Sequence, residues 1–166
     1  MFRSPLPVTV KLLLTLFVIS LPLSAATAQQ ITVRKLWYGI YAVKESKEIP
    51  DPTSPTGTRY ENTGVAGPRV NSSDIEREPR IYFGFGYRVD GTGTIEEIYL
   101  LPDANGNRRD EPAFRQMRSV RAGEENFIGW YTGNGESKGN PLGTWTFQLR
   151  QNGRVLVEHT FYLTDR

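Results

Sequence analysis

The 166-residue chain contains no cysteine. It therefore cannot form a disulfide, carry a thiol-linked bacterial lipid anchor, use a thiolate nucleophile or bind zinc through cysteine. A domain of this size buries roughly two-thirds of its unfolded surface. We expect the fold to be held together by one hydrophobic core.

Histidine is almost as scarce, because His159 is the only one in the chain. A single imidazole excludes a metal site built from several histidines. A Ser-His-Asp constellation would need His159 to be accessible and oriented by a carboxylate. The hairpin register predicted below places it at the end of an apolar row instead, which favours a structural role.

Long hydrophobic runs are also rare, and the one at the start of the chain has the features of a signal peptide. Residues 1–28 carry two basic residues ahead of the apolar run 12–23 and end in small residues. Pro22 interrupts the run and no stop-transfer charges follow, so an uncleaved anchor is the weaker alternative. We predict cleavage after Ala28, a periplasmic or secreted product without a transmembrane segment, and a single domain over residues 29–166.

The mature chain has no excess of positive charge. The full chain has 20 basic and 18 acidic side chains, and cleavage would remove two basic ones. The local cluster of arginines is interleaved with acids: Arg108, Arg109, Arg115, Arg118 and Arg121 against Asp110, Glu111, Glu124 and Glu125. Phosphate backbones are bound by clustered basic surfaces, so we expect no nucleic-acid partner.

Helical spacing of apolar residues is missing, whereas short β-prone runs alternate with Gly, Pro, Asn and Asp clusters. This pattern predicts an all-β fold. Segment 44–68 is rich in proline and is expected to be irregular, with one short edge strand near 58–62. Segment 114–121 has one helical turn as its alternative. The other expected strands are 31–43, 80–89, 94–101, 113–120, 127–132 and the two arms of a hairpin within 143–163.

The strand 80–89 places Ile81, Phe83, Phe85, Tyr87 and Val89 on one face at period two. Its other face contains two glycines, which weaken a strand unless a neighbouring group needs the space. We expect sheet packing to fill that space, in preference to a ligand pressed against the backbone.

The hairpin near the C-terminus has two possible registers. A two-residue Asn152-Gly153 turn would set Phe147 against Glu158, whereas a three-residue loop keeps both apolar rows inside. We therefore predict the loop 151–153. It pairs Leu149 with Val155, Phe147 with Val157 and Trp145 with His159, and on the solvent side Glu158 with Thr146 and Arg150 with Arg154.

Catalytic motifs are not recognisable. Carboxylates occur in adjacent pairs, at 96–97, 110–111 and 124–125. Neighbours on a strand point to opposite faces, so these pairs do not form an acid/base couple. The glycine-rich loop 132–141 lacks the strand-loop-helix context of a phosphate cradle. We expect no enzymatic activity and no catalytic or cofactor-binding residue.

One loop has a weak resemblance to a calcium-binding loop. The spacing of its first oxygen-bearing residues is that of calcium ligands, but Arg108 occupies the position where such loops have glycine. A plain Asn-Gly turn is the alternative, which we prefer. The calcium ligands of this hypothesis would be Asp103, Asn105, Asn107, Asp110 and Glu111.

Four features follow one another along the chain. They are Tyr-Gly-Ile-Tyr at 38–41, Pro-Thr-Gly at 55–57, Phe-Gly-Phe-Gly-Tyr at 83–87, and Pro-Leu-Gly-Thr-Trp-Thr-Phe at 141–147 with Asn152-Gly153 and Phe161 behind it. In this order they resemble a functionally uncharacterised family of exported bacterial domains, a domain of unknown function. The resemblance implies an immunoglobulin-like antiparallel β-sandwich of about seven or eight strands in the cell envelope, and it carries over no catalytic residue.

The sequence thus favours a non-catalytic exported β-sandwich that binds a protein partner or supports an envelope assembly. The alternative is a small-ligand or carbohydrate-binding module that uses loop aromatics such as Trp130 and Tyr131. Exposure of these rings in a flat row would support the alternative, and their burial would remove its motive.

Overall fold

The structure is a computed structural model that describes residues 30–43, 46–54, 57–62, 65–132 and 140–165. These residues form eleven strands and no helix, so none of them lies in a helix that could span a membrane. The expected signal peptide at 1–28 lies outside the described residues. The strands are β1 (Thr32–Val43), β2 (Ser46–Pro50), β3 (Thr58–Asn62), β4 (Val65–Val70), β5 (Asp74–Glu76), β6 (Tyr82–Asp90), β7 (Gly93–Leu100), β8 (Phe114–Val120), β9 (Glu125–Tyr131), β10 (Gly143–Gln151) and β11 (Arg154–Thr164).

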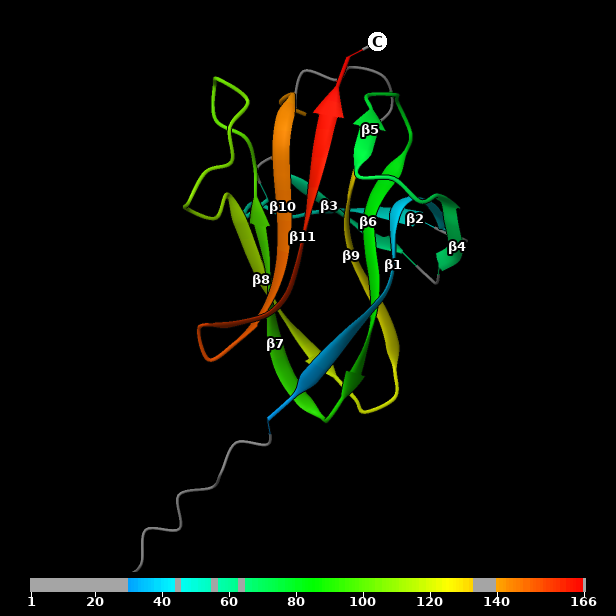
Figure 1. Cartoon of the computed structure of the whole chain (residues 1–166), viewed down its shortest axis with the longest axis vertical. Coiled ribbons are helices and arrows are strands. Elements are labelled where there is room, and N and C mark those ends of the chain that lie inside the picture. The colour runs from blue at the N-terminus through cyan, green and yellow to red at the C-terminus, as the bar shows by residue number, and fades with distance from the viewer. Residues whose placement is uncertain (1–29, 44–45, 55–56, 63–64, 133–139, 166) are drawn as a thin grey trace, which may run out of the picture.

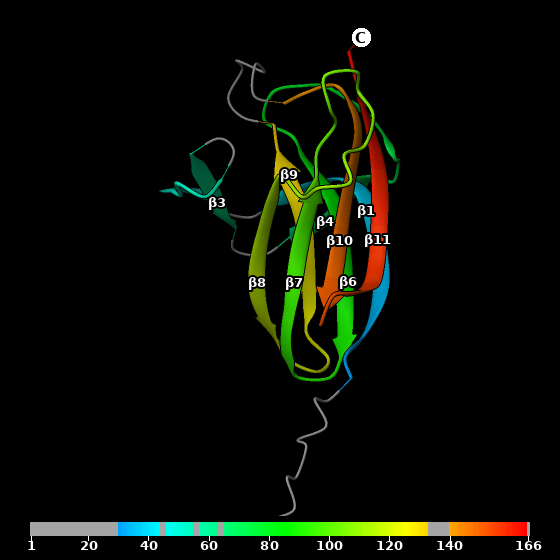
Figure 2. The same ribbon diagram turned by 90° about the vertical axis from the view of Figure 1, so that its left-hand side faces the viewer.

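Two sheets packed face to face make up the body of the protein (Figure 1). One has the strand order β4-β1-β6-β9, and the other the order β5-β11-β10-β7-β8. Neighbouring strands are antiparallel, except that β5 runs parallel to β11. Strands β2 and β3 form a separate hairpin that stands off the sandwich on the side of β8 and β9 (Figure 2). The predicted all-β sandwich is confirmed.

The predicted strands lie within a few residues of the observed ones, and the structure adds others. Segment 113–120 is strand β8 and not a helical turn. The edge strand expected near 58–62 is confirmed as β3, and the proline-rich connection 44–68 also contains β2 and most of β4, which were not expected. Proline is compatible with these strands because Pro50 ends β2 and Pro68 lies on the sheet-edge strand β4. The three-residue strand β5 has too short a pattern to be predicted.

The core lies between the two sheets and is largely aromatic. Phe83 on β6 is fully buried, and its ring centroid lies 5.5–5.6 Å from those of three rings on the opposite sheet. These rings belong to Trp145, Phe147 and Phe161, each 0% exposed. Such contacts contribute packing energy beyond the apolar area that they bury. The inward face predicted for β6 is therefore confirmed.

The two glycines of β6 face outward and leave space for their neighbours, as predicted. A Cβ atom at Gly86 would lie 2.2 Å from the indole of Trp37 on β1. A Cβ atom at Gly84 would lie 2.1 Å from the backbone oxygen of Ile128 on β9. Both glycines are therefore explained by packing within the four-stranded sheet.

The predicted register of the C-terminal hairpin is wrong. Gln151 pairs with Arg154 around a two-residue turn, in which Asn152 (φ 52°) and Gly153 (φ 78°) are both left-handed. This primed turn matches the twist of the two strands. Beyond it Leu149 pairs with Val157, and Leu156 is left without a partner as a β-bulge. Further pairs include Phe147–His159 and Trp145–Phe161 on the inner face, and Gln148–Glu158 and Arg150–Val155 on the outer face.

The bulge explains why the inward face of β11 was nevertheless predicted correctly from Val157 onward, whereas Val155, which was expected inside, lies opposite Arg150 on the outer face. A two-residue turn alone would have turned the apolar row of β11 outward, because each side chain would shift by one position. The extra residue at Leu156 reverses that shift. Consequently Phe161 and Leu163 remain inside with Trp145, Phe147 and Leu149.

Candidate functional site

The only histidine lies at the margin of the core, in a chain of polar contacts. His159 Nδ1 is 2.8 Å from Lys35 Nζ, and His159 Nε2 is 3.0 Å from Ser73 Oγ. The imidazole packs against the ring of Tyr38 at 4.3 Å and that of Phe161 at 4.6 Å between centroids. It lies opposite Phe147, and not beside Trp145 as the predicted register had it.

The partners of the imidazole define its tautomer. An ammonium group has donors and no acceptor, so Lys35 donates and His159 Nδ1 accepts. The neutral ring then carries its proton on Nε2 and donates it to Ser73 Oγ. A general base would have to accept a proton from the serine. The arrangement is therefore the reverse of a Ser-His catalytic pair.

The protonation behaviour of this chain follows from its burial. Burial and then the neighbouring ammonium of Lys35 lower the pKa of His159 to about 4. Burial also lowers the pKa of Lys35, although Glu158 acts against this effect. The imidazole is accordingly neutral at pH 7.

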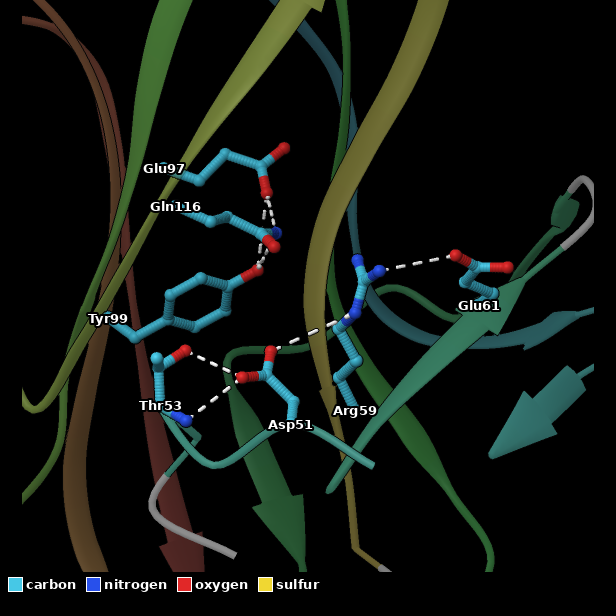
Figure 3. A network of polar contacts seen from close by, with 7 residues as sticks. All are labelled: Asp51, Thr53, Arg59, Glu61, Glu97, Tyr99 and Gln116. Atoms are coloured by element: carbon cyan, nitrogen blue, oxygen red, sulfur yellow. Dashed lines mark hydrogen bonds and ion pairs between the residues drawn. The ribbon is translucent and has the colours of Figure 1, made fainter. Parts of the chain in front are cut away.

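A second polar cluster lies between the sheets, near β8. Glu97 on β7 is 0% exposed and accepts hydrogen bonds on both carboxylate oxygens. Oε1 accepts from Arg118 Nε and from Tyr87 at 3.3 Å, whereas Oε2 accepts from Gln116 Nε2 and from Tyr99 at 3.4 Å. Figure 3 shows Glu97, Gln116 and Tyr99 from this cluster.

The Glu97 cluster has no group in an activated state. Burial and the nearby carboxylate raise the pKa of Tyr87 and that of Tyr99 well above the usual value, so both phenols stay protonated donors. The carboxylate is compensated by Arg118, a pairing that a buried charge requires. The cluster therefore orders the interior of the sandwich.

Sequence reasoning treated Glu96 and Glu97 only as an adjacent pair, and correctly expected them on opposite faces. Glu96 lies on the outer face and pairs with Arg115 at 3.6 Å, whereas Glu97 points into the core. The signal that could have found the cluster is the inward row Ile95-Glu97-Tyr99, in which one acid interrupts an apolar face.

Of the other two acidic pairs, the pair at 124–125 makes local contacts and the pair at 110–111 is exposed. Glu125 pairs with Arg88 across β6 and β9, and Glu124 Oε2 accepts the backbone N–H of Arg121 at 3.2 Å. Asp110 and Glu111 are exposed.

The loop of the calcium hypothesis is a compact turn. Asp103 Oδ1 accepts the backbone N–H groups of Asn105 at 2.8 Å and of Asn107 at 2.9 Å. Among the described residues no group of three or more His, Asp or Glu side chains could hold a metal ion together. The plain turn, and not calcium binding by Asp103, Asn105, Asn107, Asp110 and Glu111, stays our prediction for this loop.

The aromatics of the carbohydrate alternative pack into the fold. The ring centroid of Trp130 lies 6.0 Å from that of Tyr99 and 5.3 Å from that of Trp145. Its indole N–H donates to Asn140 Oδ1 at 2.7 Å. Tyr131 stacks on Tyr82 at 4.5 Å. Both side chains are half-buried and lie on opposite faces of β9, so they neither form a flat exposed row nor are fully buried. The carbohydrate-binding alternative stays a prediction.

The separate hairpin carries a small polar network at its tip (Figure 3). Asp51 Oδ1 accepts the hydroxyl of Thr53 at 2.6 Å and its backbone N–H at 2.9 Å. These hydrogen bonds lower the pKa of Asp51. Arg59 forms two ion pairs, in which its Nε lies 3.8 Å from Asp51 Oδ2 and its Nη2 lies 3.3 Å from Glu61 Oε1. Tyr60 connects this hairpin to the body through an edge contact with Tyr131, at 4.6 Å.

Taken together, these contacts define a β-sandwich domain in which the buried carboxylate of Glu97 and the half-buried imidazole of His159 both have hydrogen-bond partners. Residues 29–163 match the family model of the domain of unknown function DUF3859, and the chain belongs to this family. No curated protein matches the chain. A similar solved structure is an immunoglobulin-like protein from Pseudomonas aeruginosa at 1.50 Å resolution. The two are 16% identical over 81% of this chain and 97% of that one, with a TM-score of 0.49.

Proposed function

We propose that this domain is a non-catalytic binding module of the bacterial cell envelope. The observation that carries the proposal is the direction of the hydrogen bonds at His159. The only imidazole accepts from Lys35 and donates to Ser73, so it is oriented to hold structure and not to remove a proton. The buried carboxylate of Glu97 is likewise saturated by four donors.

Export is supported by the start of the chain. The expected leader ends at Ala28, and the family match begins at residue 29. The absence of cysteine is compatible with an oxidising compartment, because the fold does not depend on disulfides. We expect the mature protein to begin at Gln29, in the periplasm or outside the cell.

Binding of a partner is supported by the sheet edge at β8. In the part of the chain that the structure describes, β8 pairs only with β7. Its seven residues contain neither proline nor glycine, and their register with β7 is uninterrupted. A strand that is paired along only one of its edges can accept a strand from another protein along the other edge. Met117 at its centre is 69% exposed, so an apolar side chain is available to a partner at this edge.

Site-specific photocrosslinking in the native envelope tests this proposal. A benzophenone amino acid at Met117 is expected to give a discrete crosslinked species. The matched control is the same amino acid at Val155, which is 41% exposed at the far end of the C-terminal hairpin. Crosslinks of equal yield from both positions, or from neither, would contradict partner binding at β8.

Two further measurements test the rest of the proposal. Mass spectrometry of the mature protein should place its amino terminus at Gln29, and an intact leader would contradict export by cleavage. Purified protein should not turn over a panel of ester, glycoside and peptide substrates. Turnover that disappears on replacement of one carboxylate would overturn the non-catalytic assignment.

A further inference from the structure

The contacts of His159 join three separate parts of the fold. Lys35 is on β1 of the four-stranded sheet, His159 is on β11 of the five-stranded sheet, and Ser73 lies in the connection between β4 and β5. Lys35 Nζ also lies 3.5 Å from the backbone oxygen of Glu158. One half-buried imidazole thus links the two sheets to each other and to the segment that precedes β5.

The surroundings of this imidazole contain a cation, Lys35. Burial lowers the pKa of Lys35, and Glu158, the acid that acts to raise it, does not contact the ring of His159. From β1 it faces Lys35 and the ring of Tyr38, and from β6 the ring of Phe85 at 6.4 Å. On its own strand the nearest acid is Glu158, whose carboxylate turns to the outer face and accepts from Gln148 Nε2 at 2.8 Å. Among the described residues no carboxylate contacts either ring nitrogen of His159.

Protonation of the ring would therefore have a defined local effect. Nδ1 would become a donor and could no longer accept from Lys35, so two cations would face each other at 2.8 Å. Because no carboxylate contacts the ring, this repulsion favours movement of one of the two side chains away from the other. The link between β1 and β11 through these side chains would then be lost.

We propose that Lys35, His159 and Ser73 form a proton-sensitive clasp, which ties the two sheets together while the imidazole is neutral and opens when it is protonated. The opening is local, because the backbone of Ser73 remains tied to β11 through its oxygen, which accepts Tyr162 N–H at 2.8 Å. The clasp goes beyond the proposed binding function, since it would make the β1–β11 side of an envelope protein responsive to acid.

The acidity needed to open the clasp follows from the burial of the ring. The pKa of His159 is lowered to about 4 by burial and by Lys35. The clasp is therefore closed at neutral pH and opens only under markedly acidic conditions. If the pKa of His159 had its ordinary value near 6.5, the imidazole would be protonated and the clasp open over much of the pH range below 7.

Proton NMR of the untagged protein tests the proposal directly, because His159 is the only histidine. We expect its ring signals to titrate with a midpoint well below 6.5. The amide signals of Lys35 and Ser73 should move with the same midpoint, whereas amides of the β7–β8 pair should not. A midpoint near 6.5, or a ring titration that leaves Lys35 and Ser73 unaffected, would overturn the clasp.

Two variants separate the clasp from a general effect of burial. Lys35→Met removes the opposing cation and is expected to raise the midpoint of His159 toward 6.5, and Lys35→Gln repeats the test if that variant is poorly folded. Lys47→Met, which removes an exposed lysine from the separate hairpin, is the matched control and should leave the midpoint unchanged. An unchanged midpoint in both Lys35 variants would contradict the proposed role of the ammonium.

Discussion

The indole of Trp37 on β1 lies directly over Gly86 of the neighbouring strand β6, in the place that a side chain at position 86 would occupy. Trp37 in turn packs against Tyr41 at 5.3 Å between ring centroids, and Tyr41 packs against Phe127 of β9 at 5.6 Å. Aromatic side chains therefore also pack on the outer face of the four-stranded sheet, where Trp37 covers the backbone of Gly86.

Gly86→Ala should therefore destabilise the protein by overpacking. The added Cβ would lie 2.2 Å from the indole, and Trp37 would have to move. We expect a loss of about 1–3 kcal/mol in the free energy of unfolding, measured by urea denaturation.

Gly93→Ala is the control for this substitution. Its added Cβ would meet only the end of the Ile31 side chain, at 3.2 Å, which can move aside more easily. Equal losses for the two variants would mean that glycine flexibility, and not the indole, determines the effect.

Arg118→Leu should be more harmful than the loss of an ordinary surface arginine. It would leave the carboxylate of Glu97, which is 0% exposed, without its counter-charge. We expect the free energy of unfolding to fall by roughly 3 kcal/mol. This value is at the low end of the cost of removing one partner of a buried ion pair, because the Arg118 side chain is 36% exposed. Chemical denaturation at pH 7 measures it.

Two variants make this test specific. Arg115→Leu removes an exposed arginine from the same strand and should cost less than about 1 kcal/mol. The double variant Glu97→Leu/Arg118→Leu should recover much of the stability, because no buried charge is left unpaired. A double variant as unstable as Arg118→Leu would show that packing and not charge dominates at this position.

Much of the fold could be predicted from the sequence because its strongest pattern is local. The inward row of β6, from Phe83 to Val89, follows from period-two alternation. The glycines on the opposite face lack side chains, which predicts that a neighbouring group fills the space above them. Of the strands within 44–68, only β3 was predicted. Strands β2 and β4 were missed because proline argues against a strand, although it is tolerated at strand ends and sheet edges.

The candidate site was less accessible to sequence reasoning. His159 was correctly placed near the core margin, but Lys35 and Ser73 are 124 and 86 residues away in the chain. No spacing rule connects such positions. The hairpin register failed for a different reason, because a three-residue loop and a two-residue turn followed by a bulge both place Val157, His159 and Phe161 on the inner face, and the alternation alone does not distinguish them.

The turn of the C-terminal hairpin should depend on the conformation of Gly153. Its φ of 78° is unfavourable for a residue with a side chain, so Gly153→Ala should lower stability by about 1 kcal/mol. Asn152→Gly should change stability by less than about half of that, because glycine adopts the φ of 52° freely. Thermal unfolding compares the two variants, and equal effects would contradict the turn geometry.

The stability of the protein should fall as the pH is lowered from 7 to 4. The unfolded chain binds a proton at His159 near pH 6.5, whereas the folded chain binds it only near the lowered pKa of about 4. The contribution is thus complete above pH 6.5 and is lost between 6.5 and 4. After allowance for solvent screening of a half-buried ring, we expect about 1–2 kcal/mol from this residue.

His159→Gln provides the comparison for this pH dependence. The variant lacks the titrating group, so its stability at pH 4.5 relative to pH 7 should decrease less than that of the parent protein. Parallel curves of unfolding free energy against pH would show that other groups are responsible.

Calorimetric titration with calcium should give no binding heat at millimolar concentration. Asp103 Oδ1 already accepts two backbone N–H groups, and two arginines follow in the same loop. A saturable heat that disappears in Asp103→Ala would instead establish a calcium site in the loop 103–111.

The bulge at Leu156 also bears on how this hairpin tolerates changes in length. Deletion of Leu156 alone would keep every inward residue of β11 from Val157 to Leu163 inside, because Leu149 would still pair with Val157 in a regular ladder behind the two-residue turn. The hairpin can therefore lose this residue without exposing its buried face. Natural relatives with the same two-residue turn and one residue fewer in this strand should lack the bulge.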